Sequence, residues 1–549
     1  MSEQVRLGDL VVKNFDQLDA DQQVWKDHWE EVIRFQVPSK DNVWGQRTPG
    51  NKANQRVFDG TAIKAGRKLA NHLVSIMINP SSKWLSMTTR NFELDKDENV
   101  HAWLDMVSER ILSFLDGSNF YDAAHEYFLD LVHLNTACMF IGKHPTKKIS
   151  FITQPVFEWK IAENANHEVN VSYRSFKFTL RQLVEEFGLE AIQGDDRLEK
   201  DFQHDPNRKV ELIHAIEPRD NFKTTKFEDV NIENQNTFLS ITVMKDSKKV
   251  LRVKGFNKNP LAVTRWSRQS GEVYGRGPGT EARPEVKTLQ VMKRVVLEAG
   301  QLSVAPPLQT TDNSLMKPVK FTPFGITYRR PGTDPIQPLV TGARPDIGLD
   351  LIQATQQDVK EFFFNDKLEI AEANRQTATE IIQRRDENFR ELGAVSSRID
   401  NEFITPMVDR VFDILWQDGE FGSAEDLPTK LQERLKENDG ELGVKYSSLI
   451  DKALVSGEAE NFTRAIQASG PVVQNDPNVM DNVDGDAVLR HNMVVMKAPA
   501  SFLKPKREVQ QIRERRDQAQ QQRLEAEQAK TESETVKNIG DASNEQQQS

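Results

Sequence analysis

The sequence predicts an α+β fold that is predominantly helical, and two periodicities carry this prediction. Apolar residues recur every three to four positions from about residue 16 to residue 131 and again from about residue 284 onward, as in helices packed on one side. Between about residues 148 and 256 the period changes to two, as in half-buried strands. The length of 549 residues excludes a single small module, because one domain usually takes about 100–200 residues.

The first third of the chain contains four predicted helices. The first runs from about Asp16 to Gln36 and is closed by Pro38. The second ends at Asn79, because a residue before proline is disfavoured in a helix. Ser118 or Asn119 can cap the fourth. The four apolar stripes are Trp25, Trp29, Val32 and Ile33; Ile63, Gly66, Ala70, Leu73 and Met77; Val100, Trp103, Val107 and Ile111; and Tyr121, Ala124, Phe128 and Leu131.

Short alternating segments follow these helices and predict strands. Asn164 to Asn166 is the predicted turn between two of them, and residues 245–249 form the hairpin connection between the last two. Residues 1 to about 265 therefore form an α+β body. The predicted strands are SFITQ, EWKIAEN, EVNVSYRSFKF, VELIHAIE, TFLSITVM and VLRVKGF.

The helix predicted from about Pro284 to Leu302 is apolar on two faces, and Pro306-Pro307 ends it. Such a helix needs two neighbours. In a monomer it is a central core helix, and in a ring it is wedged between copies of the same chain. One face carries Val286, Leu289, Met292, Val296 and Ala299, and the other carries Val291, Val295 and Leu302.

The segment from Asp312 to Arg344 has a net charge of +3 and is rich in Pro and Gly. Phe321, Phe324 and Tyr328 are interleaved with its basic residues. This pattern predicts a short β-containing excursion with an exposed basic surface. The alternative is a solvated loop with ordinary charge scatter.

The chain beyond Pro345 is predicted to be helical again. One helix runs from about Asp346 to Glu369, and after a break a capping box of Thr377 and Glu380 begins a helix of nearly forty residues, interrupted by Gly393 and bent at Pro406. Shorter helices follow between residues 425 and 499. The tail after Phe502 lacks aromatic residues, and we expect an extended helix that fades into disorder.

Composition and motifs favour a structural or binding protein over an enzyme. With 83 acidic and 72 basic side chains, the net charge of −11 argues against a surface that grips nucleic acid everywhere. The single cysteine, Cys138, is predicted to be buried and inert. His125-Glu126 lacks the second histidine of a zinc helix, and Gly142-Lys143-His144 lacks the features of a phosphate-binding loop. We therefore expect no catalytic residue, metal or cofactor.

No apolar run approaches the ~18 residues of a membrane span, and the first residues lack the pattern of a signal peptide. We expect a soluble chain that is not exported. The glycine cluster near residue 275 departs from the dinucleotide-binding spacing GxGxxG. It consists of Gly271, Gly275, Gly277 and Gly279.

Several segments in a shared order resemble the portal, or head-to-tail connector, proteins of short-tailed, T7-like bacteriophages. The resemblance covers about residues 15–510, with Asn135-Thr136 where Gly-Thr is more usual and no glycine at the Asn164 turn. The segments are FDGTAIKAGRKLANHLVSIMINPSSKW, GSNFYDAAHEYFLDLVHLNTACMFIG, VYGRGPG and RQTATEIIQRRDENFRELGAVSSRIDNEFITPMVDRVFDIL.

This resemblance implies the portal fold of wing, stem, clip and crown regions, assembled into a ring with a central channel. It implies that the two-faced helix lies between neighbouring subunits. The implied regions are a wing (1–270), a first stem helix (271–305), a clip (306–345), a second stem helix (346–369), a tunnel loop (370–377), a long wing helix with its connection (378–424), a crown (425–502) and a tail (503–549) that is a helix or disordered.

The resemblance also implies partners and site residues. The ring, expected to be a dodecamer, sits at one capsid vertex of the virion after assembly in the host bacterial cytoplasm, and double-stranded DNA is packaged and ejected through it. Expected partners are the major capsid protein and scaffold, the terminase large subunit, the tail adaptor and internal core proteins, with no membrane. Glu372, Asn374 and Arg375 are expected in the tunnel loop, and Lys317, Lys320, Arg329 and Arg330 in the clip, where they dock terminase or adaptor.

Two other functions stay open at the level of the residues. One is a helical scaffold or adaptor of a viral particle without a channel. The other is a DNA-processing enzyme such as a nuclease, whose carboxylates form no recognisable motif. Arg329 and Arg330 can equally pair with acidic groups of an adjacent subunit.

Overall fold

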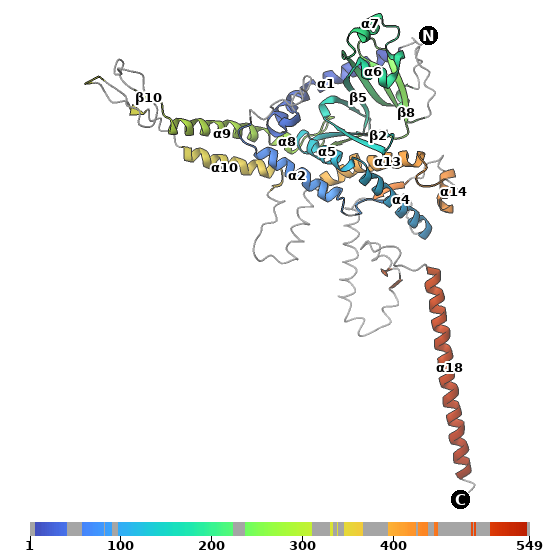
Figure 1. Cartoon of the computed structure of the whole chain (residues 1–549). Helices are drawn as coiled ribbons and strands as arrows, with labels where there is room; N and C mark the ends of the chain where they lie inside the picture. The colour runs from blue at the N-terminus through green and yellow to red at the C-terminus, as the bar shows by residue number, and fades with distance from the viewer. Residues whose placement is uncertain are drawn as a thin grey trace. The chain divides into compact units, whose positions relative to one another are not determined.

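The computed structural model divides the chain into two compact units, Met1–Ser448 and Leu449–Ser549, shown together in Figure 1. The structure describes residues 6–40, 57–81, 83–89, 97–222, 236–309, 330–332, 337–338, 345–365, 393–423, 426–437, 444–447, 485–486, 488–489 and 506–545.

The first unit begins with helix α1 (Leu7–Gln36), which is followed by the 3-10 turn η1 (Pro38–Lys40). The helix starts earlier than the predicted Asp16. Leu7, Val11 and Phe15 are buried against a sheet, and a side chain at Gly8 would collide with the carbonyl oxygen of Lys248. Tertiary contact with strands distant in sequence therefore extends the helix toward its N-terminus.

Three further helices confirm the predicted apolar stripes. Helix α2 (Thr61–Met77), helix α4 (Glu98–Gly117) and helix α5 (Phe120–Leu134) bury those stripes against one another and the neighbouring strands, except that Ile63 and Tyr121 are half-buried. Asn119 occupies the N-cap of α5, whereas the Ser118 hydroxyl accepts a hydrogen bond from the backbone N–H of Phe120. Asp97 caps α4 through its side chain.

An antiparallel five-stranded sheet follows in the order β4-β5-β6-β7-β8. All five strands were predicted. Alternate residues of β6 face opposite layers: Ile213 and Ala215 pack with α1, whereas Val210 and Leu212 pack with the small helices. The strands are β4 (Trp159–Glu163), β5 (Val169–Thr179), β6 (Lys209–Pro218), β7 (Phe238–Met244) and β8 (Val250–Phe256). The short elements beside them are η3 (Val156–Glu158), α6 (Leu180–Phe187), η4 (Leu189–Ala191), α7 (Asp196–His204) and η5 (Arg219–Phe222).

A second sheet of three strands has the order β3-β2-β9. Strand β3 (Lys148–Gln154) was predicted, but β2 (Thr136–His144) and β9 (Leu261–Arg265) were not. All five residues of β9 are buried, as are the first four of β2. A strand covered on both faces loses the alternation that reveals a half-buried strand, so its period does not identify it.

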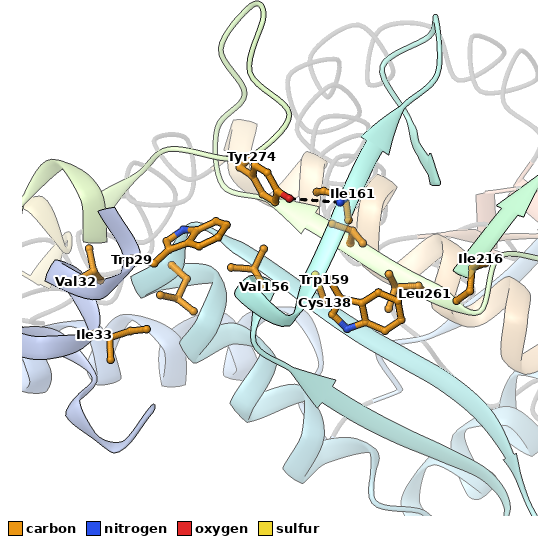
Figure 2. Close-up of a cluster of buried hydrophobic side chains, with 12 residues drawn as sticks. Trp29, Val32, Ile33, Cys138, Val156, Trp159, Ile161, Ile216, Leu261 and Tyr274 are labelled. Atoms are coloured by element: carbon orange, nitrogen blue, oxygen red, sulfur yellow. Dashed lines mark hydrogen bonds between the residues drawn. The ribbon is translucent and has the colours of Figure 1, made fainter. Parts of the chain in front are cut away.

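The two sheets and the second half of α1 share a core of aromatic and aliphatic side chains (Figure 2). Trp29 of α1 and Trp159 of β4 are almost fully buried there. The Tyr274 hydroxyl accepts hydrogen bonds from the side-chain amide of Gln22 at 2.9 Å and from the N–H of Ile161 at 3.4 Å. Tyr274 therefore holds the loop that precedes the next helices in two ways: its hydroxyl is hydrogen-bonded to α1 and β4, and its ring packs in the core.

Two long helices then lie side by side (Figure 1). They are α9 (Arg283–Val304), preceded by the short α8 (Pro278–Glu281), and α10 (Pro345–Phe362). Between them, β10 (Leu308–Gln309) pairs with β11 (Gln337–Pro338). Strand β11 and residues 330–332 are the described part of the excursion predicted from Asp312 to Arg344. Helix α10 ends before the predicted Glu369, because Phe364 adopts a left-handed backbone with φ 56° while Phe363 is buried.

The long helix predicted across Pro406 is described from residue 393. Residues 393–399 are helical, η6 (Asp400–Ile404) is a π-helix and α13 (Thr405–Gln417) continues the chain. Pro406 lacks an amide hydrogen and its ring crowds the carbonyl of Glu402, so the backbone widens just before it. The predicted irregularity at Pro406 therefore takes the form of a π-turn. The capping box of Thr377 and Glu380 lies outside the described residues.

The first unit continues past Glu425, where the crown was expected to begin. Strand β12 (Val444–Ser447) pairs with β1 (Ser86–Thr89), and helix α14 (Thr429–Glu437) buries Leu431. Backbone pairing with a strand far back in the chain keeps residues up to Ser448 in the first unit, and the crown boundary stays a prediction. In the second unit the tail expected to be a helix or disordered is helix α18 (Lys506–Glu545).

Candidate subunit interface

Helices α9 and α10 are anchored at their base by one aspartate. The Gln290 side-chain oxygen accepts the backbone N–H groups of Phe58 and Asp59 at 2.7 and 3.0 Å, and its amide donates to the Asp59 carbonyl at 2.7 Å. Gln356 of α10 donates to the Asp59 carboxylate at 2.7 Å. Both helices are therefore tied to the same turn in front of α2.

One face of each helix is buried within the chain. Val286 and Leu289 of α9 are covered, as are Ile352 and Val359 of α10. Farther along the pair the contact is close, because a methyl group added at Gly348 would lie 2.7 Å from Cγ2 of Val296. These residues correspond to the first apolar face that the sequence predicts for α9.

The second predicted face of α9 is uncovered. Val291, Val295 and Leu302 are 62%, 55% and 44% exposed, and we call them the apolar stripe of α9. Val295 is adjacent to Val296, so it projects about 100° away from the side that meets α10. Five further large apolar side chains on or beside the two helices are exposed: Leu297, Val304, Leu308, Leu349 and Leu351.

Scattered apolar residues are normal on a protein surface, but a concentration of them marks an interaction site. Covering one Val or Leu side chain completely is worth about 1.5–3 kcal/mol. The apolar stripe of α9 therefore offers several kcal/mol to whatever covers it. A helix with one face on its own chain and the other uncovered is suited to contact between subunits.

The start of this helical pair is held to the body of the first unit by hydrogen bonds at Asn135. Its backbone is left-handed, with φ 60°, and its side-chain oxygen accepts from the N–H and hydroxyl of Thr280 at 3.1 and 2.6 Å. The hydroxyl of Thr136 accepts the N–H of Gly275 at 2.8 Å. A side chain at Gly279 would overlap the backbone carbonyl of His133. Asparagine tolerates the left-handed region better than most residues, which explains why it can stand where glycine is more usual.

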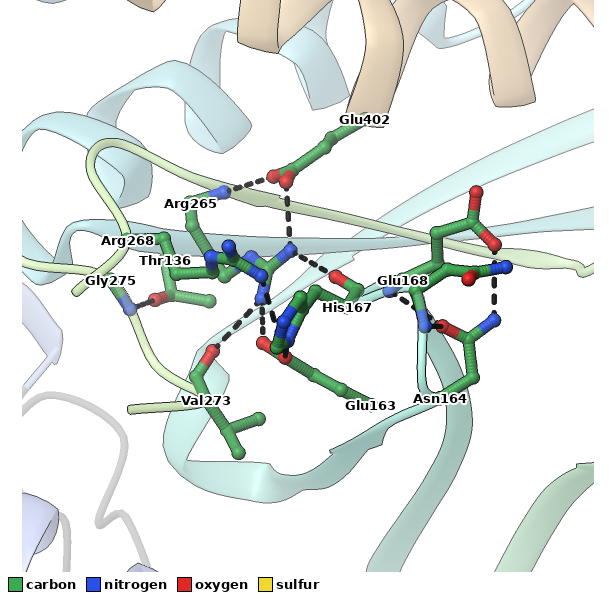
Figure 3. A network of polar contacts seen from close by, with 11 residues as sticks. Thr136, Glu163, Asn164, His167, Glu168, Arg265, Arg268, Val273, Gly275 and Glu402 are labelled. Carbon is green, nitrogen blue, oxygen red and sulfur yellow. Dashed lines mark hydrogen bonds and ion pairs between the residues drawn. The ribbon is translucent and has the colours of Figure 1, made fainter. Parts of the chain in front are cut away.

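A second junction, shown in Figure 3, joins both sheets to the π-helix η6 through Arg265. The Arg265 side chain is ion-paired with Glu163 and with Glu402, the latter at 2.8 Å, and Glu402 also accepts the Arg265 backbone N–H at 2.9 Å. Its guanidinium further donates to the carbonyl of His167 at 3.0 Å. Only 3% of the Arg265 side chain is exposed, so these partners replace water around its two terminal nitrogens, whereas its buried Nε has no hydrogen-bond partner.

Burial also shifts the pKa values of two side chains in the body, His133 and Cys138. Burial, with the nearby cations Lys40 and Arg67, lowers the pKa of His133 to about 3. Cys138 is buried, as expected, and this burial raises the pKa of its thiol far above the usual range. Among the described residues, no three His, Cys, Asp or Glu side chains are grouped to hold a metal ion. Within the same part of the chain, no helix is long and apolar enough to cross a membrane.

Comparison with known proteins decides the family. A family model for the bacteriophage head to tail connecting protein matches residues 9–503. The chain belongs to this family. It is 26% identical over 550 residues to a probable portal protein of Bordetella phage BPP-1, covering 98% of this chain and 96% of that protein. It is 24% identical over 516 residues to the portal protein of Salmonella phage epsilon15, covering 92% of this chain and 90% of that protein.

Membership in the head-to-tail connector family confirms the resemblance and the portal function that the sequence predicts. The family is structural, and no catalytic family is indicated. The α+β class is also confirmed by the mixed helices and sheets of the first unit. In this connector, the apolar stripe of α9 is the described surface that points most directly to contact with other subunits.

The connector's predicted site residues fall largely outside the described structure. Arg330 is described and exposed, in the segment between β10 and β11. The remaining predicted residues lie outside the described residues, so their placement stays a prediction. They are Lys317, Lys320 and Arg329 of the clip and Glu372, Asn374 and Arg375 of the tunnel loop.

Sequence reasoning missed Arg265, Glu402 and Asn135, which hold the connector's helical pair and π-helix to its sheets. Arg265 and Glu402 are far apart in the chain and belong to no local motif, so one sequence contains no signal that pairs them. For Asn135 a signal existed. Asparagine at the end of an apolar helix and before a strand is a candidate for a left-handed terminus.

Proposed function

We propose that this connector forms a closed ring with a central channel at one vertex of the phage capsid. Double-stranded DNA passes inward through the ring during packaging and outward during ejection. The ring is proposed to be a dodecamer, and its net acidity lets DNA pass without strong adhesion, because binding to phosphates is driven by basic side chains.

The observation that carries this proposal is the uncovered apolar stripe of α9 in a chain of the connector family. Because α9 has one face on α10 and one uncovered, a neighbour can bury the stripe against a different surface of itself. Such a head-to-tail contact, repeated with a closing rotation, generates a ring. The region names are those that the family resemblance implies: α9 and α10 are proposed to be the stem pair, and residues 1–270 and the chain around η6 and α13 the wing.

The other regions are assigned partners by the same proposal. Residues 306–345 form the clip, where Lys317, Lys320, Arg329 and Arg330 meet the terminase large subunit during packaging and the tail adaptor afterwards. Residues 370–377 form the tunnel loop, where Glu372, Asn374 and Arg375 face passing DNA. The wing and crown contact the major capsid protein, the scaffold and internal core proteins.

The double substitution Val291→Asp and Val295→Asp tests ring formation. It places two charges in the proposed interface, while both positions are exposed in the isolated chain. We expect the purified variant to keep its circular dichroism spectrum and to lose the ring in mass photometry and in electron micrographs. A wild-type chain that stays monomeric at high concentration contradicts the proposal.

The matched control is Gln301→Asp, at an exposed polar position of the same helix outside the apolar stripe. It adds the same kind of charge without entering the interface, so the ring should persist. Equal loss of the ring in the control and the double variant would show that charge on α9, and not the apolar stripe, governs assembly.

A further inference from the structure

Helix α18 of the second unit has a charge distribution that its own stability does not explain. Residues 506–523 carry six basic and three acidic side chains, whereas residues 524–545 carry two basic and six acidic ones. The N-terminus of a helix favours negative charge and its C-terminus favours positive charge. The observed order is the reverse. Because the effect falls off within the first and last turns, it does not account for the arginines at residues 513–523, which lie farther inside the helix.

The basic half of α18 concentrates its charge on one side. Arg513, Arg516, Gln520 and Arg523 follow one another at spacings of three, four and three, which places them on a common face. We call these four residues the basic face of α18. Every side chain from residue 513 to residue 526 is exposed.

Asp517, four residues after Arg513, borders the basic face, whereas two other charged neighbours point elsewhere. Each step along a helix turns about 100°, so Glu514 and Arg515 project away from the basic face. Arg513 forms a two-pronged ion pair with Asp486, at 2.6 and 2.7 Å, with both side chains more than half exposed. Exposed pairs of this kind contribute little, so another anion can replace the aspartate.

We propose that the basic face of α18 binds the phosphate backbone of duplex DNA without regard to sequence. The proposal rests on the DNA passage proposed above. Arg516 and Arg523 lie about 10 Å apart along the helix axis, a distance that covers about three base-pair steps of a duplex. Guanidinium and amide groups are the side chains that proteins use to hold phosphate oxygens.

The composition of the face favours duplex DNA over two other partners. Between Arg513 and Arg523 the only apolar residue is Ala519, whereas a protein partner usually needs an apolar or aromatic centre. No aromatic residue follows Phe502, so the helix has no ring on which the bases of a single strand could stack. Charge and hydrogen bonding are what it offers, and these suit a phosphate backbone.

The test compares substitutions at adjacent residues in the full-length protein. The affinity for a fluorescein-labelled duplex of random sequence is measured by fluorescence anisotropy at several salt concentrations. Arg516→Gln should lower the affinity about eightfold at 0.1 M salt and reduce the salt slope by about 0.9 for each helix engaged. Arg516→Lys should restore most of the affinity, because a phosphate contact needs the charge.

The control is Arg515→Gln, which removes the same charge one residue away and off the basic face. We expect its affinity to stay within about twofold of wild type, since its side chain does not face the bound duplex. Equal losses in Arg515→Gln and Arg516→Gln would mean that net charge alone attracts DNA, and this result overturns the assigned face. Unchanged binding in Arg516→Gln overturns it as well.

Ring formation is measured on the same samples by mass photometry. Rings that form normally while Arg516→Gln binds DNA like wild type contradict the DNA contact of α18 and leave the portal proposal intact. Failure of the wild-type chain to form rings contradicts the portal proposal, whatever the DNA affinity of α18.

Discussion

The body of the first unit and its helical pair α9 and α10 differ in how far their side chains are buried. In the body, Phe403 is fully buried on the ring of Tyr127, with ring centres 4.1 Å apart, and Arg265 is surrounded by partners. In the helical pair, Val291 and Val295 are more than half exposed. These groups of the body find their partners within one chain, whereas the pair leaves an apolar surface for another.

Among substitutions in these two regions, removal of the Phe403 ring is expected to lower the free energy of unfolding most. Phe403→Ala leaves a cavity beside Tyr127 and should lower the free energy of unfolding by about 3–5 kcal/mol. Val295→Ala, as its counterpart on the apolar stripe of α9, should change the stability of the monomer by less than about 0.5 kcal/mol. Urea denaturation of dilute, unassembled protein measures both. Similar losses would show that the stripe is covered within the chain.

The buried charge network should come next. Arg265→Met leaves Glu163 and Glu402 without their common partner, and breaking such a pair costs about 3 kcal/mol. A double-mutant cycle with Glu402→Gln measures the coupling between the two side chains. We expect the second substitution to cost less in the Arg265→Met background than alone, and additive losses would mean that the pair is not coupled.

Acid should weaken the body through His133. Its pKa is about 3 in the folded protein and near 6.5 when unfolded, so the two states bind protons equally above pH 6.5. Below that pH His133 is protonated in the unfolded state but not in the folded state. The free energy of unfolding therefore falls by about 1.4 kcal/mol per pH unit until pH 3.

The variant His133→Gln removes this contribution, so its stability should fall less steeply between pH 6.5 and 5 than that of the wild type. Denaturation at a series of pH values measures the two slopes. Identical slopes would mean that His133 is protonated in the folded protein as readily as in the unfolded one.

The smallest effect is expected at the junction where the helical pair leaves the body. Asn135→Gly loses the hydrogen bonds to Thr280 but relieves a left-handed backbone, so stability should change by a few tenths of a kcal/mol. Asn135→Ala loses the bonds and keeps the unfavourable backbone, and it should cost about 1–2 kcal/mol. Thermal unfolding of the two variants gives the difference, and reversal of their order contradicts the role assigned to the Asn135 side chain.

Local signals were sufficient for most of the secondary structure and for the two faces of α9. Helices α2, α4 and α5 have apolar stripes that any neighbour can bury, and the five strands from β4 to β8 alternate because one face differs from the other. Strands β2 and β9 were not predicted, because both of their faces are covered. The start of α1 escaped because its first turns are stabilised by a sheet formed much later in the chain.

The sequence by itself determined the fold class, the connector family and the presence of a helix with two apolar faces, because periodicity and motif order are properties of neighbouring residues. Only the tertiary structure decided which of those faces is covered by α10 and which stays exposed. It alone joined Arg265 to Glu402 and Asn135 to Thr280. Such pairings depend on segments that meet in space, and a helical period states that a face is apolar without stating what will cover it.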